Sequence, residues 1–371
     1  MLNSLYIGNK DGGIISTVTQ APHTGAPVVV IGLGGTGVDA AARLKSKLRK
    51  QIIPDNEDRV KANGDEPEYD SIRFLGIDAD SGWLEKSGLS NAEVLNIQNY
   101  QFHAIFAPER LPALKRKSEL QWMSIDYMAR NLPPTPDGAG AYRQFGRWLT
   151  IESAGAIESK LTQVISKACM GRIGNQLNVH VISSISGGMG AGSFVDVCYI
   201  LKRVIEGFGF SEAKTFGYFI LPDAIISKEA IIGDQIKAGS NQRNGMASLL
   251  EIEKLMNLKE SNEWFKQDYG AFEIETQEEL VDMCHFVSAT NTEGVPVANG
   301  YEYALNVVGD YILAFVSKEE IVENDYDLSI NKYKEIIVEP PKYENPKVIL
   351  KQIMEMEEEF QKQLKELEEL L

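Results

Sequence analysis

The sequence predicts an α/β fold in which a parallel sheet is flanked by helices. Two segments carry this prediction, and each joins a short apolar, β-branched run to a glycine-rich loop and then to a helical pattern. The first unit spans residues 27–44 and the second spans residues 179–201. Short apolar runs of this kind are typical of strands that are buried on both faces. Two strand–loop–helix units in one chain therefore favour a Rossmann-like sheet covered on both sides.

The loop of the second unit is the strongest functional signal in the chain. Its sequence is Ser186-Gly187-Gly188-Met189-Gly190-Ala191-Gly192-Ser193. Each glycine costs backbone entropy on folding, but glycine lets backbone N–H groups approach a ligand closely. A helix start behind the loop adds partial positive charge, and Ser193 is a candidate N-cap for that helix. We interpret the loop as a phosphate cradle. The alternative is a tight strand–helix turn packed against a neighbouring segment.

The first unit contains a similar loop between a strand at residues 27–31 and a helix at residues 38–50. The loop sequence is Gly32-Leu33-Gly34-Gly35-Thr36-Gly37. A single G-x-G-x-x-G match suits a dinucleotide site as well as any other phosphate site. A dinucleotide fold normally needs only this one loop, so the presence of both loops is more specific.

Together, these two loops resemble the nucleotide loops of the tubulin/FtsZ superfamily. That superfamily has the signature G-G-G-T-G-S/T-G, and here Met189 replaces the usual threonine. The variant is similar to divergent bacterial tubulin-like proteins, and the resemblance covers residues 27–260. It implies a GTPase-type domain with a long central helix that binds GTP or GDP together with Mg²⁺. It also implies head-to-tail self-assembly into filaments or other homo-oligomers, with the nucleotide between successive subunits.

An acidic loop follows the next predicted strand, at residues 72–77. Its sequence is Asp78-Ala79-Asp80. In open α/β sheets, ligands bind at the carboxyl ends of the strands. The resemblance implies that Asp78 faces the nucleotide through Mg²⁺ or water, with Asp80 as a second candidate. The alternative is a cap for a helix at residues 81–86. The ribose-binding acid of a dinucleotide fold would lie about 20 residues after the glycine loop, and Asp78 lies about twice as far.

A third small-residue loop opens a helical pattern that extends from residue 143 to about residue 170. It resembles the superfamily loop that wraps the terminal phosphate, and the residues it would offer are Gly138, Ala139, Gly140 and Arg143. Arg143 and Arg147 lie four residues apart, on one helical face. They are candidates for phosphate contacts. The alternative is a basic face paired with nearby acids.

Two further candidates follow from the resemblance. A predicted strand at residues 215–221 ends at Pro222-Asp223, where the family places a loop near the ribose. An aspartate after proline at a turn also needs no ligand. The next helix resembles the central helix, whose first turn offers an asparagine to guanine. An amide both donates and accepts hydrogen bonds, which suits the polar edge of guanine. Asn244 matches the family's asparagine best, and Asn241 is the alternative.

The catalytic loop of the superfamily, Asn-x-Asp-x-x-Asp/Glu, has no convincing match after residue 260. The nearest approximations are Asn291/Glu293 and Asn306/Asp310. Glu293 and Asp310 are therefore the candidate catalytic acids, which in the family would complete the site of the next subunit. This departure leaves GTP hydrolysis open.

The predicted organisation has five parts. They are an N-terminal arm or hairpin (1–26), a nucleotide-binding domain (27–240), a central helix (241–260), a reduced C-terminal domain (261–345) and a C-terminal amphipathic helix or coiled coil (346–371). We also expect strands at 94–97, 283–288 and 336–338, and helices at 119–131 and 301–317. The apolar 3–4 spacing of the tail makes it a candidate surface for a partner helix.

The composition excludes some classes of function. A net charge of −16 disfavours direct nucleic-acid binding. Three scattered cysteines suggest no disulfide framework and fit a reducing compartment. We see no secretory signal and no apolar run of the roughly 18 residues that a transmembrane segment needs. We therefore expect a cytoplasmic protein.

Three functions remain after this survey. The leading one is a self-assembling, tubulin/FtsZ-like GTP-binding protein that is a candidate GTPase. The second is a dinucleotide-dependent oxidoreductase, which would leave the second glycine loop without a role. The third is a nucleotide-bound scaffold that does not hydrolyse and acts through its helical tail.

Overall fold

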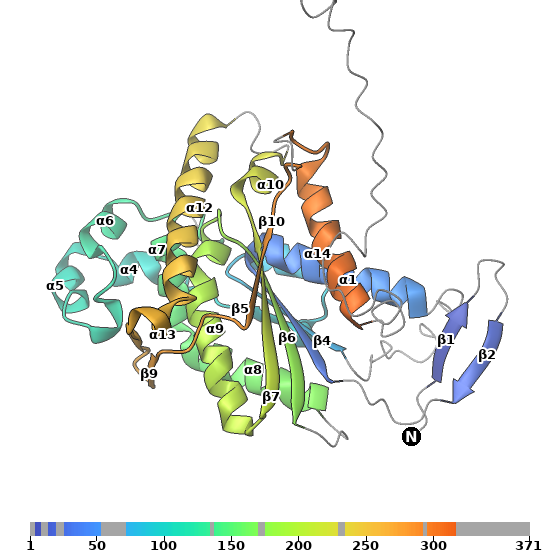
Figure 1. Ribbon diagram of the computed structural model, residues 1–371. Coiled ribbons are helices and arrows are strands. Elements are labelled where there is room, and N and C mark those ends of the chain that lie inside the picture. The colour runs from blue at the N-terminus through green and yellow to red at the C-terminus, as the bar shows by residue number, and fades with distance from the viewer. Residues whose placement is uncertain are drawn as a thin grey trace, which may run out of the picture. The chain divides into compact units, whose positions relative to one another are not determined.

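A computed structural model describes residues 4–8, 14–19, 26–52, 72–133, 137–169, 175–228, 234–291 and 295–316. Its centre is a six-stranded sheet in the order β10-β7-β6-β3-β4-β5, in which all neighbouring strands run parallel (Figure 1). The strands are β3 (Val28–Leu33), β4 (Ile72–Asp78), β5 (Val94–Asn96), β6 (Gln176–Ser184), β7 (Glu212–Ile220) and β10 (Met283–Val287). The predicted fold class is confirmed.

The order of the strands fixes where a ligand can bind. The chain starts in the middle of the sheet with β3, moves outward through β4 to β5, and then returns to the other side of β3 as β6. The direction of winding therefore reverses between β3 and β6. At such a switch point the connections leave on opposite faces, and a crevice opens at the carboxyl ends of the strands. Both glycine-rich loops follow these two strands.

Alternation along β3 divides the core into two layers. Val28 and Val30 pack on one face with α1 (Gly34–Ile52) and α14 (Gly300–Val316). Val29, Ile31 and Leu33 pack on the other face with α7 (Arg143–Glu152), α8 (Ala154–Cys169) and α9 (Met189–Phe208). All six β3 residues are buried. Burial on both faces explains the continuous apolar run in the sequence.

The other elements are short, apart from α12. The helices are α3 (Ser81–Lys86), α4 (Phe102–Ile105), α5 (Leu111–Leu114), α6 (Ile125–Arg130), α10 (Pro222–Ile226), α12 (Gln235–Leu255) and α13 (Leu258–Ser261). Three 3₁₀ turns are η1 (Asn91–Glu93), η2 (Pro108–Arg110) and η3 (Ser118–Leu120). Two antiparallel pairs lie outside the main sheet, namely β1 (Ser4–Gly8) with β2 (Ile14–Thr19), and β8 (Phe265–Asp268) with β9 (Glu273–Thr276). The β1–β2 pair is the hairpin expected within residues 1–26.

Both helices behind the glycine-rich loops begin earlier than the sequence predicted. Helix α1 begins at Gly34 and α9 begins at Met189, so half of each loop forms the first helical turn. The N-cap position of α9 belongs to Gly188, and the N-cap predicted at Ser193 is wrong. Ser193 is fully buried inside the helix, where its Oγ donates to the carbonyl oxygen of Gly190. Close packing of the glycines against neighbouring backbone outweighs their low helix propensity.

Other predicted boundaries shift as well. The helix expected from residue 143 to about 170 breaks at Ser153 into α7 and α8. The helix expected over residues 119–131 is present only as η3 and α6. The strand predicted at 336–338 and the C-terminal helix predicted at 346–371 lie outside the described residues.

The long central helix is present as α12, but it begins at residue 235 and ends at residue 255. It connects β7 to β10, which are neighbours in the sheet. Residues 283–316, which the sequence analysis assigned to a reduced C-terminal domain, contribute β10 to this sheet and α14 to one of its faces. Among the helices of the described chain, none combines the length and the apolar character that crossing a bilayer requires.

Candidate functional site

Four loops meet at the carboxyl ends of β3, β4 and β6. We name them loop 1 (residues 32–37), loop 2 (78–80), loop 3 (137–142) and loop 4 (185–193). The amide of Gly138 in loop 3 donates to the carbonyl oxygen of Ala79 in loop 2, over 3.2 Å. The amide of Gly188 in loop 4 donates to the carbonyl oxygen of Gly140 in loop 3, over 3.0 Å. The loops that the sequence singled out therefore form one continuous structure.

Several glycines serve the packing of these loops on one another. Gly34 has φ +67°, and a Cβ there would lie 2.6 Å from the backbone nitrogen of Gly190. A Cβ on Gly37 would lie 2.3 Å from the carbonyl oxygen of Ile182. At these positions only glycine lets the backbones approach. The alternative interpretation, a tight turn against a neighbour, therefore describes part of both glycine loops.

One part of loop 4 is open. A Cβ built on Gly187 would meet no atom within 4 Å. The adjacent Ser186 is fully buried, and its Oγ has no hydrogen-bond partner in the described chain. A buried hydroxyl without a partner costs about 1–3 kcal/mol. An open glycine beside an unsatisfied hydroxyl is an arrangement that fits a polar ligand.

The electrostatics of this edge favour an anion. Helix α1 has 19 residues and α9 has 20, and both begin within the loops. The first four N–H groups of a helix have no partner inside it, and the aligned peptide dipoles place roughly half a positive charge at that end. Two such helix ends lie side by side here, because a Cβ on Gly34 would nearly touch Gly190. Phosphate groups suit such a site.

Asp78 is the buried acid of the site. It ends β4, is 3% exposed, and its Oδ1 accepts from the amides of Ala79 (2.7 Å) and Asp80 (3.3 Å). Burial raises the pKa of its carboxyl to about 7. No donor from the described chain is bonded to Oδ2. A carboxylate that is costly to ionise and has a free oxygen fits a cation, which would favour the charged form.

Asp80 has the role that the sequence analysis gave as its alternative. Its Oδ1 accepts from the amide of Trp83 at 2.9 Å and caps α3. Within the described ranges, no group of three or more His, Cys, Asp or Glu side chains is placed to hold a metal ion. Mg²⁺ is commonly held by one or two carboxylates together with phosphate oxygens and water, and the Asp78 carboxylate is a ligand of that kind.

Arg143 and Arg147, both in α7 just after loop 3, pair with acids, as the alternative interpretation proposed. Arg143 Nε donates to the carbonyl oxygen of Ala191, and its guanidinium pairs with Glu251. Arg147 pairs with the fully buried Asp196 at 2.9 Å. Tyr269 donates to the same carboxylate at 2.9 Å. These contacts fix α7 against α9 and so support loops 3 and 4.

Asn244 lies at the loops, where it was predicted. Its Nδ2 donates to the carbonyl oxygens of Ala141 in loop 3 and Ser186 in loop 4, both at 2.9 Å. One turn later, Ser248 Oγ donates to the carbonyl oxygen of Ile185. The alternative candidate, Asn241, is 5% exposed. Helix α12 is thus attached to the site through side-chain bonds to loop backbone.

Asp223 organises the segment that follows β10. Its Oδ2 accepts from Ser288 Oγ (2.6 Å), the amide of Ala289 (2.8 Å) and Thr290 Oγ1 (2.8 Å). Its Oδ1 is buried and has no partner within the described residues. The ribose role suggested for Asp223 would have to use this second oxygen.

Asp310, one of the two candidate catalytic acids, does not join the four loops of its own chain. Glu293 lies outside the described residues. Asp310 is on α14 and pairs with Lys47 of α1. Because α1 begins at loop 1 and rises 1.5 Å per residue, Lys47 lies roughly 16 Å along the helix from Thr36. Asp310 therefore lies away from loop 1, toward the other end of α1.

One cluster beside loop 1 was missed by the sequence analysis. We name it the lysine–aromatic cluster, and its members are Asp39, Trp83, Lys228 and Tyr301. Trp83 Nε1 and the Tyr301 hydroxyl donate to the two oxygens of Asp39, at 2.9 and 2.8 Å. The Lys228 ammonium lies 4.6 Å from the Trp83 ring and 4.3 Å from the Tyr301 ring. These residues come from separate elements with no shared motif, so no sequence signal was available.

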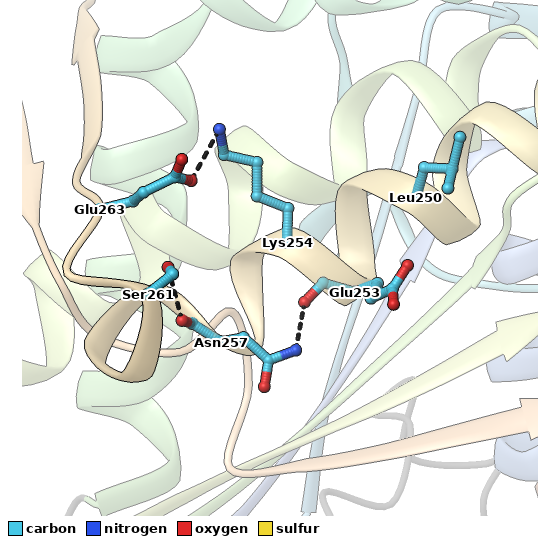
Figure 2. Close-up of a pocket in the computed structure, with 6 residues that line it drawn as sticks. All are labelled: Leu250, Glu253, Lys254, Asn257, Ser261 and Glu263. Carbon is cyan, nitrogen blue, oxygen red and sulfur yellow. Dashed lines mark hydrogen bonds and ion pairs between the residues drawn. The ribbon is translucent and has the colours of Figure 1, made fainter.

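A separate hollow lies at the C-terminal end of α12 (Figure 2). Its volume is about 290 Å³, and it is lined by Leu250, Glu253, Lys254, Asn257, Ser261 and Glu263. Lys254 pairs with Glu263 at 2.8 Å, and Asn257 Nδ2 donates to the carbonyl oxygen of Glu253 at 2.7 Å. Most of the polar side chains of the hollow are paired with one another or with backbone, so we assign it no ligand.

The fold and the loops define a parallel α/β protein with glycine-rich loops at the topological switch point. A family model described as "Tubulin like" matches residues 29–356, and the chain therefore belongs to the tubulin-like family. This confirms the superfamily indicated by the two glycine-rich loops.

Solved structures of several tubulin-like proteins are similar to the chain. A CetZ2 protofilament with GTPγS from Haloferax volcanii is 13% identical, with a TM-score of 0.40, over 80% of this chain and 62% of that one. An empty FtsZ dimer from M. jannaschii is 16% identical, with a TM-score of 0.40, over 83% and 61%. A GTPγS-form TubZ protofilament from Bacillus thuringiensis serovar israelensis is 11% identical, with a TM-score of 0.38, over 78% and 56%. The chain thus spans less than two thirds of these proteins. No curated protein matches it.

Proposed function

We propose that the chain binds GTP or GDP at its four loops and self-associates head to tail into filaments or another homo-oligomer. The observation that carries the proposal is the convergence of these loops at two helix N-termini, with the open Gly187 and the unsatisfied Ser186 hydroxyl just before the second one. Membership of the tubulin-like family supports guanine as the base.

Different groups of the site bind different parts of the nucleotide. The first-turn N–H groups of α1 and α9, with the backbone of loops 3 and 4, hold the phosphates. Asp78 holds Mg²⁺ directly or through water, and the ion neutralises phosphate charge when it is bound. Asn244 or Asn241 meets the base, and Asp223 lies on the ribose side. Arg143 contributes to phosphate binding only if it leaves Glu251.

Hydrolysis would require acids from the next subunit. In a head-to-tail assembly, such acids must lie away from the nucleotide loops of their own chain, and Asp310 meets this condition. With Glu293, it is our candidate for orienting the attacking water. Hydrolysis of this kind depends on positioning and charge stabilisation.

A non-hydrolysing, nucleotide-bound scaffold is the second candidate function. The ion pair between Asp310 and Lys47 favours it, because a carboxylate that is paired within its own chain is less available to the site of a neighbouring subunit. The two candidates share the nucleotide site and differ only in turnover and in assembly.

The test is the GTPase rate per molecule at increasing protein concentration, with sedimentation of the same samples. Intersubunit hydrolysis predicts a rate that rises steeply above a threshold, with protein in the pellet only when GTP is present. The scaffold predicts tight retention of nucleotide with no turnover at any concentration. Thermal protection by NAD(H) and not by GTP would contradict both and would restore the oxidoreductase hypothesis.

A further inference from the structure

The Lys228 ammonium has unusual surroundings. It lies just after α10, half-buried, with the ring centroids of Trp83 and Tyr301 at 4.6 and 4.3 Å. Each contact is a cation–π interaction, which holds the charge without using its hydrogen-bond donors. Burial lowers the pKa of the ammonium below its ordinary value. Part of its hydration has therefore been lost.

No acceptor replaces that hydration within the described chain. Lys228 forms no ion pair and no hydrogen bond there, and the carboxylates of Asp39 and Glu302 attract it only at longer range. The two oxygens of Asp39 already accept from Trp83 and Tyr301. An ammonium has three donors, and a partly buried one without acceptors is in a costly state. The three donors of this half-buried ammonium therefore remain available for an additional anion or polar acceptor.

The other cations around the site differ from Lys228 in this respect. Arg43 of α1 pairs with Glu302. Arg143 and Arg147 pair with Glu251 and Asp196. Their charge is already used in holding elements together, whereas that of Lys228 is held in place by aromatic rings.

The position of Lys228 indicates which anion would be involved. The Trp83 ring that supports it lies against loop 1, with Nε1 3.3 Å from the place of a Cβ on Gly35. Gly35 is in the first turn of α1, where the helix dipole already disfavours a second positive charge. A cation and a helix N-terminus placed together both favour the same negative ligand. Phosphate is the negative part of the ligand proposed above.

We propose that Lys228 contacts a phosphate group of the nucleotide at loop 1, with Trp83 and Tyr301 holding its ammonium ready for that contact. This role rests on the proposed function, since it names a residue of the same site. It adds a cation from the end of α10 to a site whose other phosphate contacts are mainly backbone N–H groups.

The first test is isothermal titration of GTP and of guanosine into the wild-type chain, Lys228→Gln and Lys228→Arg. Charge-assisted hydrogen bonds predict that Lys228→Gln binds GTP about 10- to 100-fold more weakly. Guanosine affinity stays unchanged, because guanosine has no phosphate. Lys228→Arg recovers most of the GTP affinity. The matched control is Lys259→Gln on α13, an exposed lysine outside the four loops, which leaves both affinities as they are.

Unchanged GTP affinity in Lys228→Gln would overturn the proposal. An equal loss for GTP and guanosine would also overturn it, because it would show a structural role. If the wild-type chain binds neither ligand, the proposed function itself fails. That result differs from a wild-type chain that binds GTP and a variant that binds it equally well.

A second measurement uses the wild-type chain and does not depend on how a variant folds. Acetic anhydride labels exposed and half-buried lysines, and mass spectrometry reports the extent at Lys228. We expect GTP and inorganic triphosphate to reduce labelling of Lys228 several-fold, guanosine to have no effect, and Lys259 to stay equally reactive throughout. Labelling of Lys228 that is the same with and without GTP would contradict the proposal.

Discussion

Loops 1 and 4 have similar sequences but different surroundings. Loop 1 is covered on one side by side chains from distant elements, and the Trp83 ring lies against Gly35. Loop 4 keeps an open segment at Gly187, beside the unsatisfied Ser186 hydroxyl. A glycine motif therefore indicates only that other atoms approach the backbone closely. In loop 1 many of those atoms belong to the protein itself, whereas loop 4 leaves space for a ligand.

The two loops also differ in the contacts that support them. Removing the support of loop 4 gives the largest predicted loss of unfolding free energy. Behind loop 4, Asp196 is fully buried and bonded to Arg147 and Tyr269. Asp196→Ala leaves the partly buried Arg147 guanidinium without its carboxylate partner and should lower the free energy of unfolding by about 3 kcal/mol, measured by urea denaturation. Glu158→Ala is the control. It removes the exposed pair with Arg203, also on α9, and should cost less than about 1 kcal/mol. Equal losses would show that loop 4 does not depend on this buried support.

Disrupting the contact between loops 1 and 4 gives the next predicted loss of unfolding free energy, which is of similar size. Gly34→Ala puts a Cβ at φ +67° and 2.6 Å from Gly190, so we expect a loss of about 3 kcal/mol in unfolding free energy. Gly155→Ala in α8 is the matched control, because a Cβ there meets no atom within 4 Å. It should leave stability within about 1 kcal/mol of wild type or increase it. A Gly34→Ala protein as stable as this control would mean that the loops are not packed as described.

The pH dependence of stability should distinguish Asp78 from the rest of the site. Burial raises its pKa to about 7 in the folded chain, above the ordinary value of 3.8. The folded chain therefore binds more protons than the unfolded chain between about pH 4 and pH 7, and stability falls as the pH rises through that window. Asp78→Asn should remove a slope of the order of 1 kcal/mol per pH unit, measured by denaturation at pH 5, 6, 7 and 8 without Mg²⁺. If stability depends on pH equally in the wild-type and Asp78→Asn proteins, the raised pKa of Asp78 is contradicted.

The smallest predicted effect concerns the cover of loop 1. Trp83→Ala removes the bond to Asp39 and the ring beneath Lys228, which together contribute about 1–2 kcal/mol to unfolding free energy. Trp264→Ala is a fair comparison, because Trp264 is also exposed and its ring centroid lies 6.0 Å from the Lys266 ammonium. We expect that variant to stay within about 0.5 kcal/mol of wild type. A larger loss for Trp264→Ala would show that the lysine–aromatic cluster is only a surface contact.

The sequence was sufficient for the fold class and for most of the loops. Buried parallel strands leave continuous apolar runs, as at residues 27–31, and glycine-rich segments mark where the chain turns at their ends. Because all parallel strands end at the same edge, loops after β3, β4 and β6 had to meet. The family was indicated by the resemblance of the two glycine-rich loops to those of the tubulin/FtsZ superfamily, and the family model shows it.

Partners that come from distant segments could not be predicted. Whether Arg147 faces a phosphate or an acid depends on Asp196, which is 49 residues away. The lysine–aromatic cluster joins residues up to 262 positions apart. Serine is a residue type that favours the N-cap position, which is why Ser193 was predicted there. Tight packing of the glycines instead lets α9 begin at Met189. Tertiary contacts decided each of these cases, whereas the sequence pattern reports mainly local preferences.

The most direct test of the nucleotide site is the GTP affinity of Gly187→Val. A Cβ at this position would meet no protein atom within 4 Å, so we expect the variant to fold with near wild-type stability while its side chain fills the open part of loop 4. We predict at least a 100-fold loss of GTP affinity by isothermal titration, with an unchanged melting temperature. Gly155→Val, at an equally open glycine in α8, should bind GTP like wild type. A Gly187→Val protein that binds GTP as tightly as wild type would contradict our account of the site.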